Sequence, residues 1–226
     1  MSSPESGESP FRRLGERERF DGGFFRVATG TFVGPDGFAF EREVVRHPGA
    51  VCIVPLEADR RSVLMIRQYR GAVDAALLEL PAGKRDLPDE DPAVCAEREL
   101  EEEIGRQASV MTEIARFYNS PGFTDEETIC FLADGLREVP RRSHGVEEEH
   151  IVVERISLGD LEDLMETGDL VDAKSIIGLL AARVALGWTT RAPGVTPRPA
   201  EASESAPAPR QQPSPGPSGA PAAGEQ

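Results

Sequence analysis

Three glutamates, at positions 99, 102 and 103, have the type and spacing best suited to chemistry in this sequence. We expect segment 91–105, DPAVCAERELEEEIG, to be a helix, which turns by about 100° per residue. Glu103 then lies about 40° to one side of Glu99, and Glu102 about 60° to the other. The three carboxylates share one face and repel one another. A divalent cation such as Mg²⁺ reverses this repulsion, because it prefers oxygen ligands and keeps several waters.

The alternative for this helix is a solvated acidic face, which is what most charge runs are. The wider spacing argues against that alternative. Gly83 is followed by six residues, then Glu90, then seven residues, and then Arg98-Glu99-Leu100-x-Glu102-Glu103-x-Gly105. The neighbouring face of the helix is apolar and suited to packing on a sheet, with Ala93, Ala96, Leu100 and Ile104. The acidic face therefore borders the core, where a cleft can form.

This spacing resembles the Nudix box, G-x5-E-x7-R-E-U-x-E-E-x-G-U, in which U is apolar. The sequence departs from the box at two points: six residues instead of five precede Glu90, and Arg106 occupies the last apolar position. The extra residue lies in the loop before the helix, so it leaves the carboxylate spacing unchanged. Arg106 lies just past the glycine at which the helix is expected to end. We expect neither departure to alter the chemistry.

The resemblance implies a metal site on the acidic face. Its ligands would be Glu99, Glu102 and Glu103, with the carbonyl oxygen of Ala82 as a further ligand. The metal would be Mg²⁺, with Mn²⁺ as an alternative.

The remaining box positions would support this site. Arg98 would orient the glutamates through charge-assisted hydrogen bonds, and Glu90 would brace the loop against the helix. A carboxylate favoured by the helix dipole is nearly as good an interpretation of Glu90. Gly83 begins the box. Asp91 is expected to cap the start of the helix, with Pro92 at its first position, and Gly105 suits its end. Cys95 is expected to be a small buried residue, because no histidine lies near it in the sequence.

Outside the box, residues 20–187 resemble the ADP-ribose pyrophosphatase subfamily. Pro121, 16 residues after Gly105, matches the proline that characterises this subfamily, although Ser-Pro-Gly alone is simply a turn. The resemblance implies that further residues contact the substrate, namely Arg67, Tyr69, Arg70 and Glu79. An arginine suits a diphosphate because it forms bidentate hydrogen bonds. A surface arginine at a strand end is an equally good interpretation of Arg70.

The loop 145–150, GVEEEH, is expected to supply the catalytic base. Aligned by the following Ile151, Glu147 matches the base of the family best, and Glu148 is the alternative one residue away. Glu149 is expected to join the metal ligands. An acidic surface loop is an equally good interpretation of this segment.

The implied reaction is hydrolysis of ADP-ribose to AMP and ribose 5-phosphate. Metal ions would lower the pKa of the attacking water, and the base would accept its proton. One alternative substrate is another nucleoside diphosphate sugar, such as GDP-mannose. A non-catalytic sensor of ADP-ribose is a different class, which the complete set of box glutamates disfavours. An RNA-cap hydrolase is disfavoured because no basic patch is present.

The elements that position these residues indicate an α/β (α+β) fold with a mixed sheet between helices, which the resemblance identifies as the Nudix fold. An N-terminal antiparallel hairpin is expected over 24–33 and 38–47, around Gly34-Pro35-Asp36-Gly37. Further strands are expected at 50–56, 62–70, 76–83, 108–117, 128–133 and 150–157. Helices are expected at 91–105, 159–167 and 173–186, the last as a core-packing helix.

The chain divides into four parts by composition. Residues 1–18 are expected to be flexible, and 19–48 form a β region that the resemblance links to a homodimer. Residues 49–189 would form the Nudix domain. Residues 190–226 contain nine of the 19 prolines, with Ala and Ser between them, and are expected to be a disordered tail.

The net charge of -15 limits the partners. Residues 1–20 and 190–226 each sum to zero, so the excess lies in 21–189 and disfavours nucleic acid. The domain can still bind a nucleoside diphosphate if divalent cations lie between the two negative charges. No apolar run approaches the ~18 residues of a membrane span, and the N-terminus lacks signal-peptide features. Three widely spaced cysteines indicate neither a disulfide framework nor a zinc site, so we expect a reducing cytoplasm.

Overall fold

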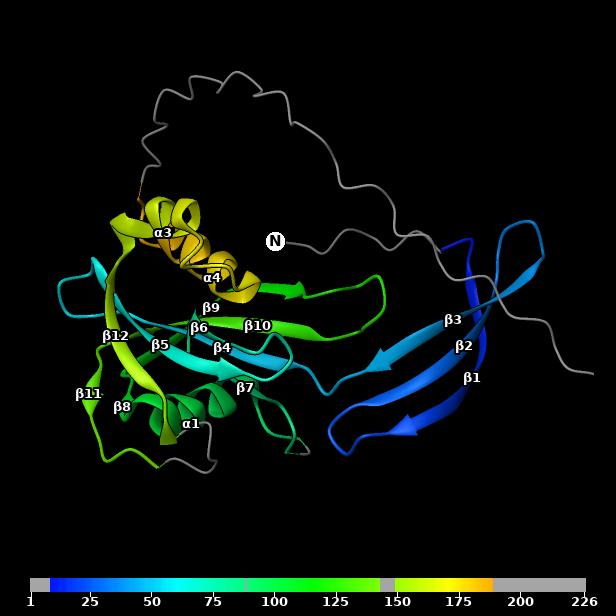
Figure 1. The fold of residues 1–226 in the computed structure, drawn as a ribbon, viewed down its shortest axis with the longest axis horizontal. Coiled ribbons are helices and arrows are strands. Elements are labelled where there is room, and N and C mark those ends of the chain that lie inside the picture. The colour runs from blue at the N-terminus through cyan, green and yellow to red at the C-terminus, as the bar shows by residue number, and fades with distance from the viewer. Residues whose placement is uncertain (1–8, 88, 143–148, 189–226) are drawn as a thin grey trace, which may run out of the picture. The chain divides into compact units, whose positions relative to one another are not determined.

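The computed structural model describes residues 9–87, 89–142 and 149–188 (Figure 1). The chain begins with a three-stranded antiparallel sheet in the order β1-β2-β3. Its strands are β1 (Arg12–Asp21), β2 (Arg26–Val33) and β3 (Ala39–Arg46). The predicted hairpin is confirmed as β2 and β3, and Gly37, with φ of 82°, occupies the turn conformation that favours glycine.

Strand β1 begins at Arg12, inside the segment 1–18 that was expected to be flexible. All its residues are exposed, so no alternation of apolar and polar side chains marks it as a strand. Pairing with β2 holds it in place, as do long-range polar contacts such as the ion pair between Glu16 and Arg46 of β3, with 2.5 Å between Oε2 and Nη2. The partners that hold β1 in place are thus distant in the sequence, and a local pattern does not reveal them.

Two further sheets follow. A mixed four-stranded sheet has the order β7-β4-β10-β9, with β4 and β10 parallel. Its strands are β4 (Ala50–Pro55), β7 (Ala82–Lys84), β9 (Val110–Tyr118) and β10 (Glu127–Asp134). An antiparallel sheet has the order β12-β5-β6, from β5 (Ser62–Arg70), β6 (Ala75–Glu79) and β12 (Val152–Ser157). A short pair joins β8 (Arg106–Gln107) to β11 (Arg137–Glu138).

The segment 76–83 differs from its prediction, because it contains two strands that belong to different sheets. The chain leaves β6 after Glu79 and enters β7 at Ala82. Pro81 has no N–H to donate to a ladder, and its carbonyl accepts a hydrogen bond from the backbone N–H of Ile53 at 2.8 Å. The break puts Ala82 in the lining of a cleft, whereas Glu79 does not line it and instead pairs with Arg70 and Lys174, which do.

Helices cover both faces of the central strands, as the fold prediction requires. They are α1 (Pro92–Ile104), the 3₁₀ turn η1 (Leu158–Asp160), α3 (Leu161–Thr167) and α4 (Ala173–Ala185). Alternate residues of β4 enter two separate cores, with Val51 and Ile53 packed on the α1 side. Cys52 and Val54 pack on the side of α3 and α4. Figure 1 shows α1 on one side of β4 and α4 on the other.

Helix α1 is confirmed with the predicted caps. The side chain of Asp91 accepts a hydrogen bond from the backbone N–H of Ala93 at 2.8 Å, and Pro92 opens the helix. Gly105 has φ of 62°, the left-handed conformation that ends a helix, and its N–H bonds to the carbonyl of Glu101 at 3.1 Å. The apolar face, which includes Ala96 and Leu100, is buried. The opposite edge is therefore fixed at the border of the core.

None of the helices in the described ranges is long and apolar enough to cross a membrane. The three cysteines, Cys52, Cys95 and Cys130, are free thiols in the interior. The tail predicted for 190–226 lies outside the described residues.

Candidate active site

A cleft of about 1020 Å³ is lined by several parts of the chain. Helix α1 and strand β7 contribute the box residues, and β5 and the start of α4 contribute the opposite wall. Its polar lining includes Gln68, Arg70, Arg98, Glu99, Glu102, Glu103, Asp172 and Lys174. The three predicted metal-binding glutamates are thus brought together on one side of the cleft.

Arg98 holds the carboxylates of α1 in place. Its Nη1 donates to Oε1 of Glu99 at 2.8 Å and to Oε2 of Glu102 at 3.1 Å. Its Nε donates to Oε1 of Glu90 at 3.3 Å, which ties the preceding loop to the helix. Burial opposes the charge of Arg98, but these ion pairs outweigh it and raise the pKa of Arg98 above its ordinary value. The geometry matches the supporting contacts expected for Arg98 and Glu90.

Position 83 of strand β7 lies against the side chain of Glu99. A Cβ at Gly83 would overlap the carboxylate of Glu99. One residue earlier, the backbone N–H of Ala82 donates to Oε2 of Glu103 at 2.9 Å. Both Glu99 and Glu103 are buried, at 8% and 4% exposure. Strand β7 therefore bonds to the carboxylate of Glu103 and, through Gly83, leaves room for that of Glu99.

The donor set of this wall fits a magnesium ion. Its side chains offer carboxylate oxygens, and the backbone of Ala82 offers a carbonyl oxygen. Such oxygen ligands suit Mg²⁺ or Mn²⁺. Across the described ranges, no three acidic, histidine or cysteine side chains already converge as a metal cage. Mg²⁺ commonly binds through one or two carboxylates and keeps its waters, so it does not require such a cage.

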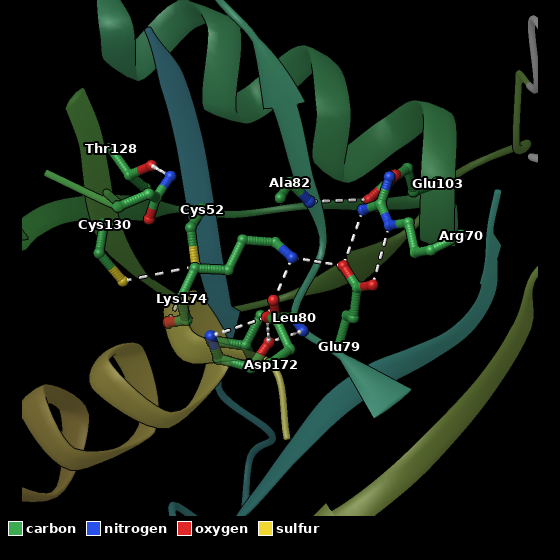
Figure 2. A network of polar contacts seen from close by, with 12 residues as sticks. Cys52, Arg70, Glu79, Leu80, Ala82, Glu103, Thr128, Cys130, Asp172 and Lys174 are labelled. Atoms are coloured by element: carbon green, nitrogen blue, oxygen red, sulfur yellow. Dashed lines mark hydrogen bonds and ion pairs between the residues drawn. The ribbon is translucent and has the colours of Figure 1, made fainter. Parts of the chain in front are cut away.

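The opposite wall is a network centred on Glu79, which is 1% exposed (Figure 2). Arg70 forms a bidentate pair with Glu79, from Nε at 2.8 Å and from Nη2 at 2.7 Å. Lys174 also pairs with Glu79, and it contacts Oδ2 of Asp172 at 2.9 Å. Burial would raise the pKa of Glu79, but Arg70 and Lys174 outweigh burial and lower that pKa. Glu79 is therefore an anchored carboxylate in its charged form.

The start of α4 is joined to the chain between β6 and β7. Oγ of Ser175 accepts a hydrogen bond from the backbone N–H of Leu80 at 2.7 Å, and it donates to Oδ2 of Asp172 at 2.5 Å. Asp172 caps the helix through the backbone N–H of Ser175. The prediction of a core-packing helix was incomplete, because it did not consider the polar first turn. An aspartate at the expected N-cap, two residues before Lys174, was the available signal.

The two faces of β5 divide the residues that were predicted to contact the substrate. Gln68 and Arg70 line the cleft, whereas Arg67 and Tyr69 do not. Arg67 pairs with Glu154 and Asp169 on the other face. Successive strand residues point to opposite sides, so the four-residue run 67–70 could not face the cleft as a unit. The proposed site is therefore built on Arg70 and on Gln68, which the sequence analysis missed, while Arg67 and Tyr69 stay predictions.

The chain between β9 and β10 lines the cleft through residues other than the predicted Pro121. Pro121 is exposed in a turn, in which the backbone N–H groups of Phe123 and Thr124 bond to the carbonyl of Ser120, and it does not line the cleft. Nearby Asn119 and Glu126 do line it.

The predicted base falls on a segment that the structure does not cover. Glu147 and Glu148 lie outside the described residues. Glu149 is exposed and does not line the cleft.

An aromatic group that the sequence analysis did not identify borders the cleft. Phe24 and His47 both line it, with ring centroids 5.7 Å apart in an edge-to-face arrangement. Nζ of Lys84 lies 4.5 Å from the centroid of the Phe24 ring. Phe24 remains 48% exposed, so its ring is accessible to a planar ligand.

The cleft, the box and the two helical layers define a Nudix hydrolase. The NUDIX domain model matches residues 46–177, and this chain belongs to that family. The ADP-ribose pyrophosphatase of Bacillus subtilis is 39% identical over 141 residues, 62% of this chain and 75% of that protein. The ADP-ribose pyrophosphatase of Mycobacterium tuberculosis is 35% identical over 174 residues, 77% of this chain and 84% of that protein.

More distant similarities agree on the fold. The GDP-mannose pyrophosphatase of Cronobacter sakazakii is 29% identical over 145 residues, 61% of this chain and 74% of that protein. A crystal structure described as an ADP compounds hydrolase superposes with a TM-score of 0.68 at 24% identity, over 79% of this chain and 95% of that chain. The resemblance to the Nudix family and the predicted fold class are thus confirmed.

Proposed function

We propose that this protein is a Mg²⁺-dependent hydrolase that cleaves ADP-ribose to AMP and ribose 5-phosphate. The observation that carries the proposal is an arginine anchored opposite the box glutamates. Arg70 is held by buried Glu79, and the carboxylate of Glu103 on α1 also contributes to the raised pKa of Arg70. A diphosphate between these walls would meet Arg70 on one side and the metal-binding carboxylates on the other. The names of the two relatives above support adenine as the base.

Arg70 is suited to bind a phosphate oxygen because only part of its guanidinium is occupied. Glu79 accepts from Nε and Nη2, and no described residue accepts from Nη1. The side chain is 38% exposed, so Nη1 can donate to an anionic ligand in the cleft. Lys174 stays paired with Glu79 and Asp172. The formal charges of Arg70, Lys174, Glu79 and Asp172 cancel. The network therefore orients the guanidinium of Arg70 without adding net charge to the cleft.

The carboxylate wall would hold the metal. Hydrolases of this family generally depend on divalent metals. Glu99, Glu102 and Glu103, with the carbonyl of Ala82, would hold Mg²⁺ here. The bound ion supplies charge neutralisation of the diphosphate and activation of water. Arg98 keeps two of the carboxylates oriented.

The base and the last ligand stay predictions. We retain Glu147 as the proposed base, with Glu148 as the neighbouring alternative, and Glu149 as a further ligand. A carboxylate in this loop would accept the proton of the attacking water.

We also propose a homodimer formed through the N-terminal sheet, in a reducing cytoplasm. Large apolar side chains of this region are exposed to solvent, namely Phe11, Leu14, Phe20 and Phe38. A second copy would cover such side chains. The free thiols in the interior are compatible with a reducing compartment. Light scattering after size-exclusion chromatography tests the dimer, and a monomeric mass at micromolar concentration would contradict it.

A second candidate substrate is GDP-mannose, favoured by the relatives that carry that name. The decisive experiment incubates the full chain with Mg²⁺ and a panel that includes ADP-ribose and GDP-mannose, and follows the nucleoside monophosphates by chromatography. We expect AMP from ADP-ribose at the highest kcat/KM. Preference for GDP-mannose would overturn the substrate, and hydrolysis of no member of the panel would overturn the activity.

A further inference from the structure

Gln68 presents an unusual polar group to the cleft. It lies in β5 opposite Leu77 of β6 and is 6% exposed, yet it lines the cleft beside Arg70. Its Oε1 is buried and accepts no hydrogen bond from any described residue. Buried polar atoms are nearly always paired, because an unpaired one loses its water without compensation. An orphaned acceptor in a cleft wall indicates a ligand that completes it.

The chemistry of Oε1 restricts this ligand. A carbonyl oxygen accepts hydrogen bonds and cannot donate them. The oxygens of an ionised diphosphate and the carboxylate of Glu103 are also acceptors, so neither can satisfy Gln68. The neighbouring donor, Arg70, directs its Nε and Nη2 to Glu79, and its Nη1 forms no hydrogen bond with Gln68. The partner must therefore bring its own O–H or N–H group.

The position of Gln68 on the strand indicates where that group lies on the substrate. Gln68 and Arg70 are two residues apart on one face of β5, a separation of about 7 Å along a strand. If Arg70 binds a phosphate oxygen, Gln68 faces the part of the molecule next to that phosphate. In a nucleoside diphosphate sugar this part is a sugar ring with hydroxyl groups. A hydroxyl can donate to Oε1 and also accept from the amide nitrogen.

We propose that Gln68 is a substrate-binding residue that accepts a hydrogen bond from a sugar hydroxyl. The inference rests on the proposed function, because that function supplies a diphosphate joined to sugars. Beyond that function, the proposed role of Gln68 would let the site distinguish a nucleoside diphosphate sugar from a diphosphate that has no sugar. Sites built to bind a hydroxyl reject ligands that lack it, since the buried partner is then left unpaired.

The test compares Gln68→Met with wild type in the full chain. Methionine keeps the length of the side chain and removes the carboxamide. The matched control is Gln107→Met, because Gln107 lies in β8, outside the cleft lining. Three quantities are measured with Mg²⁺: kcat/KM for ADP-ribose, and the inhibition constants of ADP and of inorganic pyrophosphate.

We expect Gln68→Met to lower kcat/KM for ADP-ribose about tenfold, the effect of one hydrogen bond to a buried group. The inhibition constant of pyrophosphate should stay within about twofold, because pyrophosphate has no hydroxyl of a sugar. Inhibition by ADP, which contains only the adenosine ribose, shows which of the two sugars of ADP-ribose contacts Gln68. Weaker inhibition by ADP assigns the hydroxyl to the adenosine ribose, and unchanged inhibition assigns it to the second sugar. Gln107→Met should change none of these values.

A second measurement excludes a structural role. Since methionine removes a buried unpaired acceptor, the ligand-free variant should have the same melting temperature as wild type or a higher one. A lower melting temperature would show that the amide is already paired in the free protein and would overturn the proposal. Unchanged kcat/KM would overturn it too, as would an equal loss of affinity for pyrophosphate, which would assign Gln68 to the diphosphate or to ordered water. If wild type hydrolyses no substrate, the proposed function fails instead.

Discussion

The two walls of the cleft differ in how they hold charge. On α1, Glu99, Glu102 and Glu103 lie within five consecutive positions of one helix, and Arg98 is the cation that contacts two of them. On the opposite wall, Arg70, Glu79 and Lys174 come from β5, β6 and α4, and the formal charges there cancel once Asp172 is counted. The residues of the first wall are close together in the sequence and carry excess negative charge. The residues of the second wall are far apart in the sequence, and their charges cancel.

This difference assigns different tasks to the walls. Excess negative charge near the core is unfavourable until a cation binds, so the α1 wall is poised for a metal. A neutral and mutually paired network keeps its geometry without added ions, so the opposite wall can orient Arg70 before a ligand arrives. Substitutions on α1 should therefore reduce catalysis with little loss of stability. Substitutions in the network should reduce stability as well as substrate binding.

The largest expected effect is on catalysis, from Glu103→Gln. The amide keeps the shape of the side chain and can still accept from the N–H of Ala82, but it removes one ligand charge. We expect kcat to fall by about 10²–10³-fold, since a metal contributes several kcal/mol to the transition state. The melting temperature should change little. The control is Glu101→Gln on the same helix, outside the cleft lining. Normal turnover by Glu103→Gln would contradict the metal assignment.

The next effect is on stability, from Glu79→Gln. The change leaves Arg70 and Lys174 without their shared carboxylate. Breaking a buried ion pair costs about 3–5 kcal/mol, and we expect about 2–3 kcal/mol here because the guanidinium of Arg70 is partly solvated. Urea unfolding measures the loss, and KM for ADP-ribose should rise in parallel.

A surface pair provides the control for that measurement. Glu113→Gln removes one of the two carboxylate partners of Arg116, in an exposed ion pair on β9, and it should change the free energy of unfolding by less than about 1 kcal/mol. Equal losses from Glu79→Gln and Glu113→Gln would show that the network around Glu79 has no special weight.

A smaller loss is expected from Ser175→Ala, which tests the link between α4 and the chain before β7. The buried N–H of Leu80 would lose its acceptor, at a cost of about 1–3 kcal/mol. The matched control is Ser109→Ala, whose hydroxyl bonds to the carbonyl of Gly135 at an exposed position. If Ser175→Ala is no less stable than Ser109→Ala, the link does not hold the segment that leads to Ala82.

The same contrast explains which features the sequence could predict. The caps at Asp91 and Gly105 and the apolar face of α1 follow from the pattern of one helix, and the structure has them as predicted. The box adds Gly83 and Glu90, which precede this helix and are also close to it in the sequence. The network depends on Glu79 meeting Lys174 across 95 positions, which no local pattern encodes. Gln68 and Arg70 could have been chosen over Arg67 and Tyr69 from the period of two in a strand. Strand β1 carries no such signal, because all its residues are exposed.

The smallest expected effect is a pH dependence of the free energy of unfolding, which arises from Glu79 in the neutral network. Ion pairing with Arg70 and Lys174 outweighs burial and lowers the pKa of Glu79 from its ordinary 4.5. A carboxyl with a lowered pKa stabilises the fold above its unfolded pKa, and this contribution disappears as pH falls through the folded pKa. The difference in unfolding free energy between wild type and Glu79→Gln should thus be constant from pH 7 to about 5 and shrink at lower pH. Urea titrations at several pH values measure it. A difference that stays constant to about pH 2 would mean that Glu79 contributes through packing and not through its charge.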